Sequence, residues 1–385
     1  MEDLPKSIAI VYDRVNKLGG AEKVLMALHE IFPTAPLYTS VYDSKKAPWA
    51  KIFPAVVPSF LQRIPFLKDH HEIVPFLTPI AFESFNFNQF DAVISVSSAD
   101  AKGIVTSPHT FHFCYCLTPT RYLWSHFSEY ESSLSYLEKI ISRPIFSYLK
   151  KWDLIASRRP DTYVAISHTV KDRIKTYYHQ DSQVVYPPVE VEFFKQKSEP
   201  IQPPPPNDYF LYVGRFVPYK RLDVVIESFN QTGLPLVIVG KGGISWGVGL
   251  FESKLRKMAK SNITFVGSAS PDYLRQLYQG CQAFIFFHEE DFGIVPVEAQ
   301  AAGKPVIALN KGGATETVIH GKTGILINDA SVTALTNAVK SFSKSNFDPK
   351  FITTHAQLFS KERFMEKFAK VFRQEWKTFK STYTY

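Results

Sequence analysis

The stretch His288–Ala308, HEEDFGIVPVEAQAAGKPVIA, contains an acidic cluster, a glycine and a helix-forming segment in direct succession. It follows the apolar run AFIFF at 283–287, which predicts a buried strand. Pro296 then stands in the first turn of the predicted helix, where a missing N–H is tolerated. A strand, a glycine turn and a helix in this order are typical of a parallel sheet covered by helices. The free amides from Gly293 to Val295 would face out of the helix N-terminus, which favours binding of a phosphate group.

Two glutamates lie on either side of this turn. Glu290 comes just before Gly293, and Glu298 follows about one helical turn inside the helix. Carboxylates accept hydrogen bonds from hydroxyl groups, so both could hold a ligand in which hydroxyl-bearing groups flank a diphosphate. A nucleotide sugar has this layout. The alternative is a solvated acidic loop, and we keep that interpretation for Glu289 alone.

A second loop supports phosphate binding. The segment 212–229, YVGRFVPYKRLDVVIESF, predicts a strand, a glycine turn and an amphipathic helix. Arg215 and Lys220 lie near its turn, and two cations at the carboxyl end of a strand suit a diphosphate leaving group without a metal ion. The glycine pair Gly19–Gly20 and the run VGKGG at 239–243 are weaker signals, because such turns by themselves only give the backbone room near a ligand.

The alternation of short apolar runs and helical stretches extends along the chain and restarts once. The first series of predicted strands comprises Ser7–Tyr12, Asp91–Ser97, Phe111–Cys116, Thr162–Ile166 and Gln183–Tyr186, and the second series lies between 209 and 327. We therefore predict an α/β fold with two doubly wound Rossmann-like domains that face each other across a cleft. The predicted parts are a first domain at 1–187, a semi-rigid linker at 188–206 with four consecutive prolines, a second domain at 207–355 and a C-terminal helix at 356–385. That helix would pack on the second domain or cross back to the first.

The bulk composition limits the class of protein. A chain of 385 residues exceeds what one hydrophobic core usually supports. Its apolar runs fall short of the ~20 residues that span a bilayer, and the acidic start MEDLPKSIAIVYD does not resemble a signal peptide, so we expect a cytoplasmic protein. Cys114, Cys116 and Cys281 match neither a disulfide framework nor metal-ligand spacing. The net charge of +8 is not gathered into a block typical of nucleic-acid binding, so no metal and no nucleic-acid partner are expected.

One basic segment has two interpretations. Residues 139–159, KIISRPIFSYLKKWDLIASRR, hold six basic residues and one acid, interleaved with aliphatic and aromatic side chains. Such a helix could lie on an anionic membrane surface. The ordinary interpretation is a solvated helix face, and the composition alone favours it.

Taken together, these motifs resemble the retaining nucleotide-sugar glycosyltransferases of family 4, whose two-domain fold is called GT-B. The resemblance covers nearly the whole chain. It is strongest in EDFGIVPVE and the following AQAAGKPVIALNKGGATETV, and it extends to VGRFVPYKRLD and GGAEKVL. The strings FPTAPLYTSVYD, FCYCLTPTRYLW and VVYPPVEVEFF are similar to a bacterial subgroup of mannosyltransferases that build O-antigen and exopolysaccharide repeat units.

The resemblance implies roles for particular residues. Glu290 would hold hydroxyls of the donor sugar and Glu298 the ribose, while Arg215 and Lys220 would bind the diphosphate and act with Glu290 in catalysis. Backbone amides at Gly293 to Val295 would contact sugar and phosphate. The full donor set expected from the resemblance is Gly19, Gly20, Arg215, Lys220, Val266, Gly267, Ser268, Glu290, Asp291, Phe292, Gly293, Ile294, Val295 and Glu298.

The resemblance also implies the reaction. A hexose, mannose or a related sugar, would pass from a GDP-linked donor to a growing, polyprenyl-linked glycan with retention of configuration and without a metal. The acceptor would bind on the side of the first domain, at the inner face of the cell membrane, and the second domain would bind the nucleotide sugar.

The chain departs from the family at the sugar and acceptor side, where we expect Leu117, Thr118 and Arg121. Relatives usually have histidine at the position of Leu117 and an acid at that of Ser125. That histidine lies near the 6-hydroxyl of the donor sugar. The donor could therefore be a 6-deoxy sugar, the chain could be a weakened partner subunit, or another residue could substitute. His112 is the nearest candidate, but it lies in the predicted strand Phe111–Cys116, and we favour a buried structural histidine there. We rank the altered donor first because the residues on the phosphate side are all present.

Other functions fit less well. A nucleotide-sugar epimerase on the same scaffold needs general bases, and no acid/base pair is evident beyond the donor glutamates. A noncatalytic partner subunit is supported only by Leu117. A nicotinamide dehydrogenase is disfavoured because no G-x-G-x-x-G opens the first domain.

Overall fold

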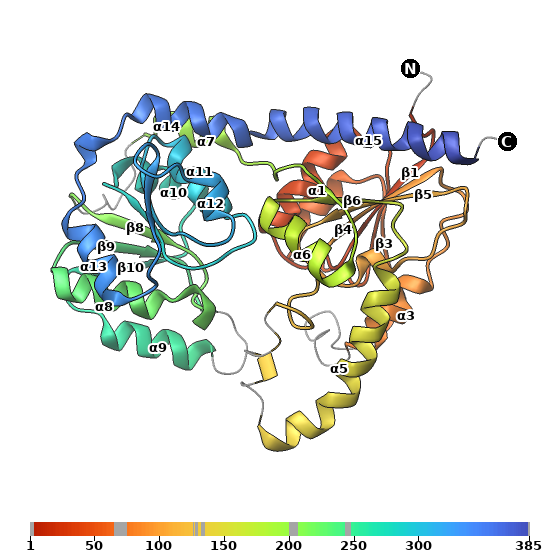
Figure 1. Cartoon of the computed structure of the whole chain (residues 1–385), viewed down its shortest axis with the longest axis horizontal. Helices are drawn as coiled ribbons and strands as arrows, with labels where there is room; N and C mark the ends of the chain where they lie inside the picture. The colour runs from red at the N-terminus through yellow and green to blue at the C-terminus, as the bar shows by residue number, and fades with distance from the viewer. Residues whose placement is uncertain are drawn as a thin grey trace. The chain divides into compact units, whose positions relative to one another are not determined.

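The computed structural model describes residues 4–64, 75–125, 127, 130–131, 135–199, 207–242 and 248–383. The chain forms two compact units (Figure 1). The first unit consists of Met1–Pro188 together with Phe364–Tyr385, and the second unit is Val189–Arg363. Each unit is an α/β layer structure with its own parallel sheet.

The first unit is built on a seven-stranded parallel sheet with the order β3-β2-β1-β4-β5-β6-β7. Its strands are β1 Ile8–Tyr12, β2 Leu37–Thr39, β3 Val56–Pro58, β4 Ala92–Ser97, β5 Phe111–Cys116, β6 Thr162–Ala165 and β7 Gln183–Val184. Its α-helices are α1 Gly20–Ile31, α3 Leu77–Glu83, α5 Tyr136–Ala156, α6 His168–Tyr178 and most of α15 Lys361–Tyr383. The central strands β4 and β5 are buried along their whole length, which explains why their sequences are mostly apolar.

The second unit is built on a six-stranded parallel sheet with the order β10-β9-β8-β11-β12-β13. Its strands are β8 Phe210–Val213, β9 Leu236–Val239, β10 Ile263–Gly267, β11 Phe284–Phe286, β12 Val306–Leu309 and β13 Gly324–Ile327. Its α-helices are α7 Val191–Lys195, α8 Leu222–Thr232, α9 Val248–Met258, α10 Pro271–Gly280, α11 Ile294–Ala301, α12 Ala314–Thr317, α13 Val332–Lys340 and α14 Pro349–Ala356.

The strand order of each sheet shows where a ligand is expected. In the second unit the chain proceeds outward from β8 through β9 to β10, and then from β11 outward in the other direction. The order therefore reverses between β8 and β11, and ligands of doubly wound sheets bind at the carboxyl ends of the strands at such a reversal. In the first unit the corresponding reversal lies between β1 and β4.

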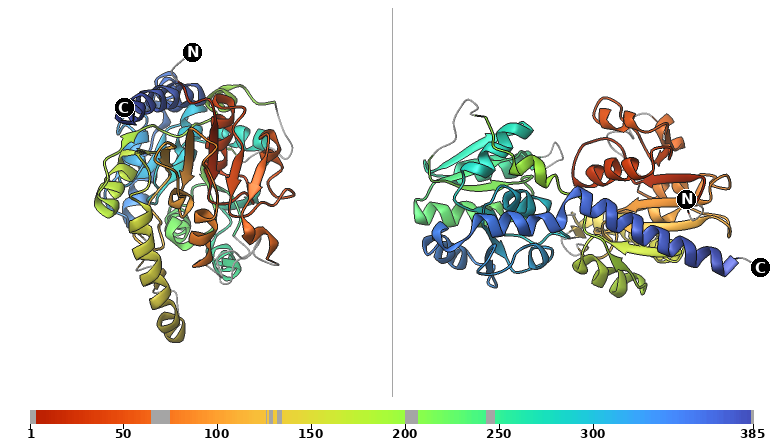
Figure 2. Two further views of the ribbon diagram at one scale, coloured as in Figure 1. Left: turned by 90° about the vertical axis from the view of Figure 1, so that its right-hand side faces the viewer. Right: turned by 90° about the horizontal axis from the view of Figure 1, so that it is seen from above.

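The C-terminal helix α15 packs on the first unit, which is one of the two expected positions (Figure 2). Phe368 is buried, and its ring lies 5.3 Å from that of Phe113 and 5.7 Å from that of Tyr115, both on β5. Phe372 adds a contact at 5.1 Å to Phe32, which follows α1. The buried face of this helix consists of aromatic residues at helical spacing, which are Phe364, Phe368, Phe372, Trp376 and Phe379.

The expected linker at 188–206 needs correction. Its first part folds into the second unit as α7, where Val191 and Phe194 are buried and Phe194 lies 5.3 Å from the ring of Tyr278 on α10. The side-chain amide of Gln279 donates hydrogen bonds to the carbonyls of Phe194 and Gln196. These apolar and polar contacts hold α7 and the residues after it on the second unit. The four prolines at 203–206 lie outside the described residues. The second unit also extends beyond 355, to Arg363.

No helix of the described residues has both the length and the apolar character needed to cross a membrane. No group of three or more His, Cys, Asp or Glu side chains in the described ranges is arranged to hold a metal ion.

Candidate functional site

The loop between β11 and α11 contains the acidic cluster. Gly293 precedes α11 with φ of 83°, a left-handed conformation that favours glycine. A Cβ atom at this position would also lie 2.9 Å from the ring of Phe286. Helix α11 begins at Ile294 and includes Pro296 in its first turn, which confirms the predicted helix start. The N-terminus of α11 thus lies at the strand reversal, with Ile294 and Val295 only partly buried.

A neighbouring loop holds this segment in place. Gly312 and Gly313 follow β12, and the amide of Gly313 donates a hydrogen bond to the carbonyl of Glu290 at 2.8 Å. A Cβ atom on Gly312 would overlap the Glu290 carbonyl, and one on Gly313 would overlap the backbone of Phe292. Both glycines are therefore required by backbone contact. They were missing from the predicted site, although a glycine pair shortly after an apolar strand can be recognised in the sequence.

Lys220 and Glu290 come together across the strand reversal. Lys220 ends the 3-10 turn Pro218–Lys220 in the loop after β8, and its Nζ lies 3.1 Å from Oε1 of Glu290. Both side chains are largely buried, with 12% and 17% of their surface exposed. The Nε2 atom of buried His288 lies 3.6 Å from the same carboxylate oxygen. A cation and a carboxylate predicted from two distant motifs thus form one cluster.

Tyr212 contributes a buried hydroxyl beside this cluster. A Cβ atom added to Gly214 would lie 3.2 Å from the Tyr212 hydroxyl and 3.5 Å from the Nζ of Lys220, so both atoms lie close to that glycine. Burial, and then the negative charge of Glu290, raise the pKa of Tyr212, which keeps the phenol neutral. Its hydroxyl has no hydrogen-bond partner among the described residues. It is therefore available as a donor next to Lys220.

Arg215 behaves differently from Lys220. Its side chain is exposed, and its guanidinium lies 3.5 Å from the hydroxyl of Tyr219. No ion pair of Arg215 is found within the described part of the chain. The two cations of this loop therefore differ in their surroundings, because Lys220 is held at Glu290 and Arg215 is exposed.

Glu298 is buried on α11 with 5% of its surface exposed. The hydroxyl of Tyr278 on α10 donates a hydrogen bond to its Oε2 at 3.1 Å. Burial, followed by the charge of Glu298, raises the pKa of Tyr278, so the phenol remains a donor. Asp291 and Phe292 are also buried, and the ring of Phe292 lies 5.6 Å from that of Phe359. The side chain of Phe292 therefore serves packing.

The carboxyl ends of β8, β9 and β10 are joined by glycines. Gly240 has φ of 139°, and a Cβ atom there would overlap the carbonyl of Gly214. Its amide donates to the carbonyl of Gly267 at 2.7 Å. Contact with the carbonyl of Gly214 after β8 thus requires a glycine at 240. The sequence alone suggests instead that this glycine gives the backbone room near a ligand. Val266 lies at a register shift between β10 and β9, and Ser268 after the strand is exposed.

Gly19 and Gly20 open α1 in the first unit. The φ of Gly19 is −158°, an extended conformation open to any residue. A Cβ atom there would lie 3.0 Å from Oε2 of Glu22. Glu22 is buried and accepts a hydrogen bond of 2.8 Å from the hydroxyl of Tyr12. The glycine thus leaves room for a buried carboxylate at the carboxyl end of β1.

The loop after β5 contains the expected sugar and acceptor residues. Leu117 is largely buried, and its amide donates to the carbonyl of Ser97 at 2.8 Å. The hydroxyl of Thr118 is buried, with no partner among the residues that the structure describes. Arg121 is partly exposed. His112 does not substitute for the missing histidine, because it is fully buried in β5 with its Nε2 atom 2.8 Å from the Ser95 hydroxyl. Burial lowers the pKa of His112 to about 3, so it is neutral.

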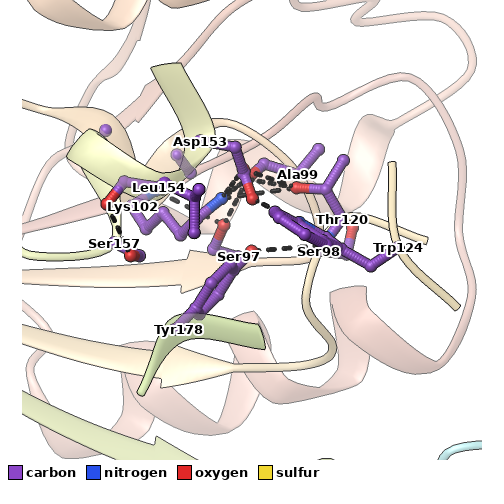
Figure 3. Close-up of polar contacts among 12 residues, drawn as sticks. Ser97, Ser98, Ala99, Lys102, Thr120, Trp124, Asp153, Leu154, Ser157 and Tyr178 are labelled. Atoms are coloured by element: carbon purple, nitrogen blue, oxygen red, sulfur yellow. Dashed lines mark hydrogen bonds and ion pairs between the residues drawn. The ribbon is translucent and has the colours of Figure 1, made fainter. Parts of the chain in front are cut away.

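A buried polar cluster anchors this loop (Figure 3). The Nζ of Lys102 lies 2.5 Å from Oδ1 of Asp153 on α5 and donates to the carbonyl of Ala99 at 2.6 Å. Asp153 also accepts hydrogen bonds from the Thr120 hydroxyl at 2.9 Å and from the Trp124 indole at 2.7 Å. Two loop residues and a helix are thus joined through one carboxylate. The predicted site did not include this cluster.

Comparison with known proteins adds to this geometry. Residues 193–357 match the model of a family described as glycosyl transferases group 1. Over 204 residues the chain is 28% identical to O-antigen chain mannosyltransferase C of Escherichia coli, an alignment that covers 50% of this chain and 51% of that protein. Over 208 residues it is 26% identical to D-rhamnosyltransferase WbpZ of Pseudomonas aeruginosa, covering 51% and 52%. The chain therefore spans about half the length of these curated relatives.

Among solved structures, the chain resembles Anabaena Alr3699/HepE in complex with UDP. The TM-score is 0.70, at 17% identity, and the match covers 95% of this chain and 99% of that one. The two Rossmann-like units therefore constitute a GT-B fold, as expected from the sequence.

Proposed function

We propose that this chain, in which residues 193–357 match the glycosyl transferases group 1 family, transfers a hexosyl unit from a nucleotide-diphosphate donor to a glycan acceptor. The observation that carries the proposal is the cluster at the strand reversal of the second unit. Lys220, from the loop after β8, meets Glu290 there, and Glu290 lies on the loop that leads into the N-terminus of α11. A cation and free amides suit a diphosphate, and a carboxylate suits sugar hydroxyls.

In this proposal the cationic side chains stabilise the leaving group and the glutamates orient the donor. The bond between the anomeric carbon and the diphosphate oxygen breaks, and the acceptor oxygen bonds to that carbon from the same face. The acceptor proton passes to the departing phosphate. Lys220, and Arg215 from the exposed side, stabilise the negative charge of the leaving group, so that no metal ion is needed. Glu290 orients the sugar and Glu298 the ribose.

We propose mannose or a related 6-deoxy hexose, carried on GDP, as the donor unit. The curated relatives that support this choice are a mannosyltransferase and a D-rhamnosyltransferase. Leu117 favours the 6-deoxy sugar, because an aliphatic side chain offers no hydrogen bond to a 6-hydroxyl. The proposed acceptor is a lipid-linked glycan. A cytoplasmic location is supported by the free, buried state of Cys114, Cys116 and Cys281.

A thermal-shift panel tests the donor site first. GDP, UDP, GDP-mannose, GDP-rhamnose and UDP-glucose are each added to the wild type and to Glu290→Gln, Glu298→Gln and Glu289→Gln. A ligand at about a hundred times its Kd stabilises the native state by about 2.7 kcal/mol. We expect a GDP-linked sugar to raise the melting temperature of the wild type and of the Glu289 control, and to do so less in the other two variants. If no nucleotide or nucleotide sugar raises it, the proposal is wrong.

The identity of the donor sugar is then tested by measuring turnover. Radiolabelled GDP-mannose and GDP-rhamnose are compared with membranes that contain the glycan acceptor. A preference for GDP-rhamnose supports the interpretation of Leu117, and a clear preference for GDP-mannose removes it. Donor binding without turnover of either sugar would favour the second candidate, a partner subunit that binds the nucleotide sugar without transferring it.

A further inference from the structure

The outward surface of α5 is apolar, although this helix lies at the protein surface. At 100° per residue, its exposed large apolar side chains fall within one arc of about 140°. They are Tyr136, Ile140, Ile141, Tyr148, Leu154 and Ile155, and we call the surface that they form the outer face of α5. Ile141 and Ile155 are 68% and 61% exposed. In Figures 1 and 2 this helix, drawn in yellow, extends away from the sheet of the first unit.

The charged residues of the outer face have one sign. Lys151 projects within the same arc and is exposed, and the exposed Arg158 follows the C-cap residue Ser157 at the end of the helix. The two acids of the helix are engaged elsewhere. Glu138 closes a capping box with Ser135 at the helix start, and Asp153 is buried against Lys102. The outer face therefore combines aliphatic and aromatic groups with positive charge.

The opposite side of α5 fixes the helix to the first unit. The ring of Phe146 lies 5.5 Å from that of Phe127, and the Nζ of Lys150 lies 3.7 Å from the centroid of the same ring. The indole of Trp152 donates to Glu83 at 2.7 Å. Together with the Asp153 cluster, these contacts orient the helix. Lys150 faces inward, so Lys151 is the basic residue that the outer face presents.

We propose that the outer face of α5 binds an anionic lipid surface. Isoleucine and tyrosine side chains insert at the boundary of head groups and acyl chains, and neighbouring lysine and arginine side chains are attracted by anionic lipids. A solvated helix normally turns polar side chains outward, which this face does not. A second copy of the chain would bring the same positive charges together with no acid on the face to balance them. The lipid surface is the occupant with complementary charge.

Vesicle sedimentation tests this proposal without any sugar substrate. The full chain is mixed with vesicles of equal parts phosphatidylglycerol and phosphatidylcholine, or with vesicles of phosphatidylcholine alone. We expect binding to the anionic vesicles that weakens as salt is added, and little binding to the neutral ones. The double variant Ile141→Glu/Ile155→Glu should reduce the partition coefficient about tenfold or more. Lys151→Gln and Arg158→Gln should each reduce it about fivefold.

Matched changes outside α5 serve as controls. Leu358→Glu replaces another exposed leucine in the second unit, and Lys171→Gln removes an exposed lysine on α6. Both should sediment with anionic vesicles as the wild type does. Thermal melts establish that every variant is folded. Absence of wild-type binding, or equal binding by the α5 variants, would overturn the proposal. So would concentration-dependent dimers in sedimentation velocity that Ile141→Glu abolishes while vesicles remain unbound, because the face would then belong to a second copy.

Discussion

At the scale of single residues, Lys220 holds the central position in the candidate donor site. Its ammonium group is the cation within 3.1 Å of Glu290, and its side chain is largely buried. Replacing it by glutamine removes positive charge from the place where the diphosphate would leave. Groups that stabilise developing charge are each worth about 10²- to 10³-fold in turnover. We therefore expect Lys220→Gln to lower kcat/KM for the nucleotide sugar by that factor.

The matched control for this prediction is Lys257→Gln, which removes an exposed lysine on α9. Its activity should equal that of the wild type. Equal activity of Lys220→Gln, measured by release of the nucleoside diphosphate, would show that the ammonium group is not part of the chemistry.

Replacement by alanine should have different effects at two glycines of the second unit, Gly214 and Gly240. An alanine at 214 would place a methyl group 3.2 Å from the Tyr212 hydroxyl and 3.5 Å from the Lys220 ammonium group, both ends of side chains that can shift. An alanine at 240 would overlap the Gly214 carbonyl at a φ of 139°. We expect Gly214→Ala to reduce activity with little loss of stability, and Gly240→Ala to destabilise the fold by about 3 kcal/mol.

Urea unfolding and nucleoside-diphosphate release, measured on both variants, distinguish these effects. The prediction fails if Gly240→Ala is as stable as the wild type. It also fails if Gly214→Ala keeps full activity, because the methyl group would then leave Lys220 in place.

Asp100 makes stability depend on pH. Burial raises the pKa of its carboxyl from 3.8 to about 7, while the nearby Lys102 lowers it and Asp13 and Asp153 raise it. The folded state therefore holds this proton more tightly than the unfolded chain does. Stability linked to the bound proton is fully present below pH 3.8 and is lost as the pH rises to about 7. An asparagine side chain at this position would remain neutral throughout.

We expect Asp100→Asn to melt at a higher temperature than the wild type at pH 8, and the difference to shrink at pH 5. Melts of the two proteins at both pH values measure it. A difference that is the same at pH 5 and pH 8 would mean that Asp100 does not titrate in this range.

At the scale of elements, α5 and the 3-10 turn Ala101–Gly103 after β4 are joined by the pair of Lys102 and Asp153. Removing one partner of such a pair leaves an uncompensated buried charge, at a typical cost of about 3–5 kcal/mol. Lys102→Met should therefore be strongly destabilising. The double variant Lys102→Met/Asp153→Leu removes both charges of the pair and should recover part of the loss. A double-mutant cycle by urea unfolding measures this, and additive losses would contradict it.

The elements also show how far the sequence predicts this fold. The predicted strand Phe111–Cys116 equals β5, and Asp91–Ser97 differs from β4 by one residue, because both are short, mostly apolar runs rich in aromatic or β-branched residues. Strands β2 and β3 were not predicted, since three residues each are too short for any periodicity. Helix α7 was assigned to a linker because its partners, Tyr278 and Gln279, lie more than eighty residues further along the chain.

In the candidate site, too, residues in local motifs can be predicted from the sequence, whereas contacts between distant segments cannot. Glu290, Lys220 and the turn at Gly293 are recognisable because each lies in a local motif after a strand. Their contact is a property of the strand order and could only be expected in general terms. The pair of Lys102 and Asp153, 51 residues apart, has no local motif at all. That this lysine and this aspartate are buried together can be recognised only from the fold.

At the scale of the whole molecule, the boundary between the units falls inside one helix, α15, after Arg363. Its buried aromatic face belongs to the first unit, whereas the proposed donor residues Lys220, Glu290 and Glu298 belong to the second. Units with separate cores can unfold separately. Phe368→Ala removes a buried ring from the first unit, where phenylalanine truncation costs about 3–5 kcal/mol. We expect calorimetry of this variant to show one transition lowered and the other unchanged.

GDP distinguishes the two transitions further. Because binding stabilises only the part that binds, GDP should raise the transition that Phe368→Ala leaves unchanged. Phe351→Ala, an exposed phenylalanine on α14, serves as the control and should shift neither transition by more than about 0.5 kcal/mol. A single transition that both GDP and Phe368→Ala displace would show that the helix makes the two units unfold together. In that case the aromatic face of α15 would stabilise the donor site as well as the first unit, and Phe368→Ala would weaken GDP binding measured by calorimetric titration.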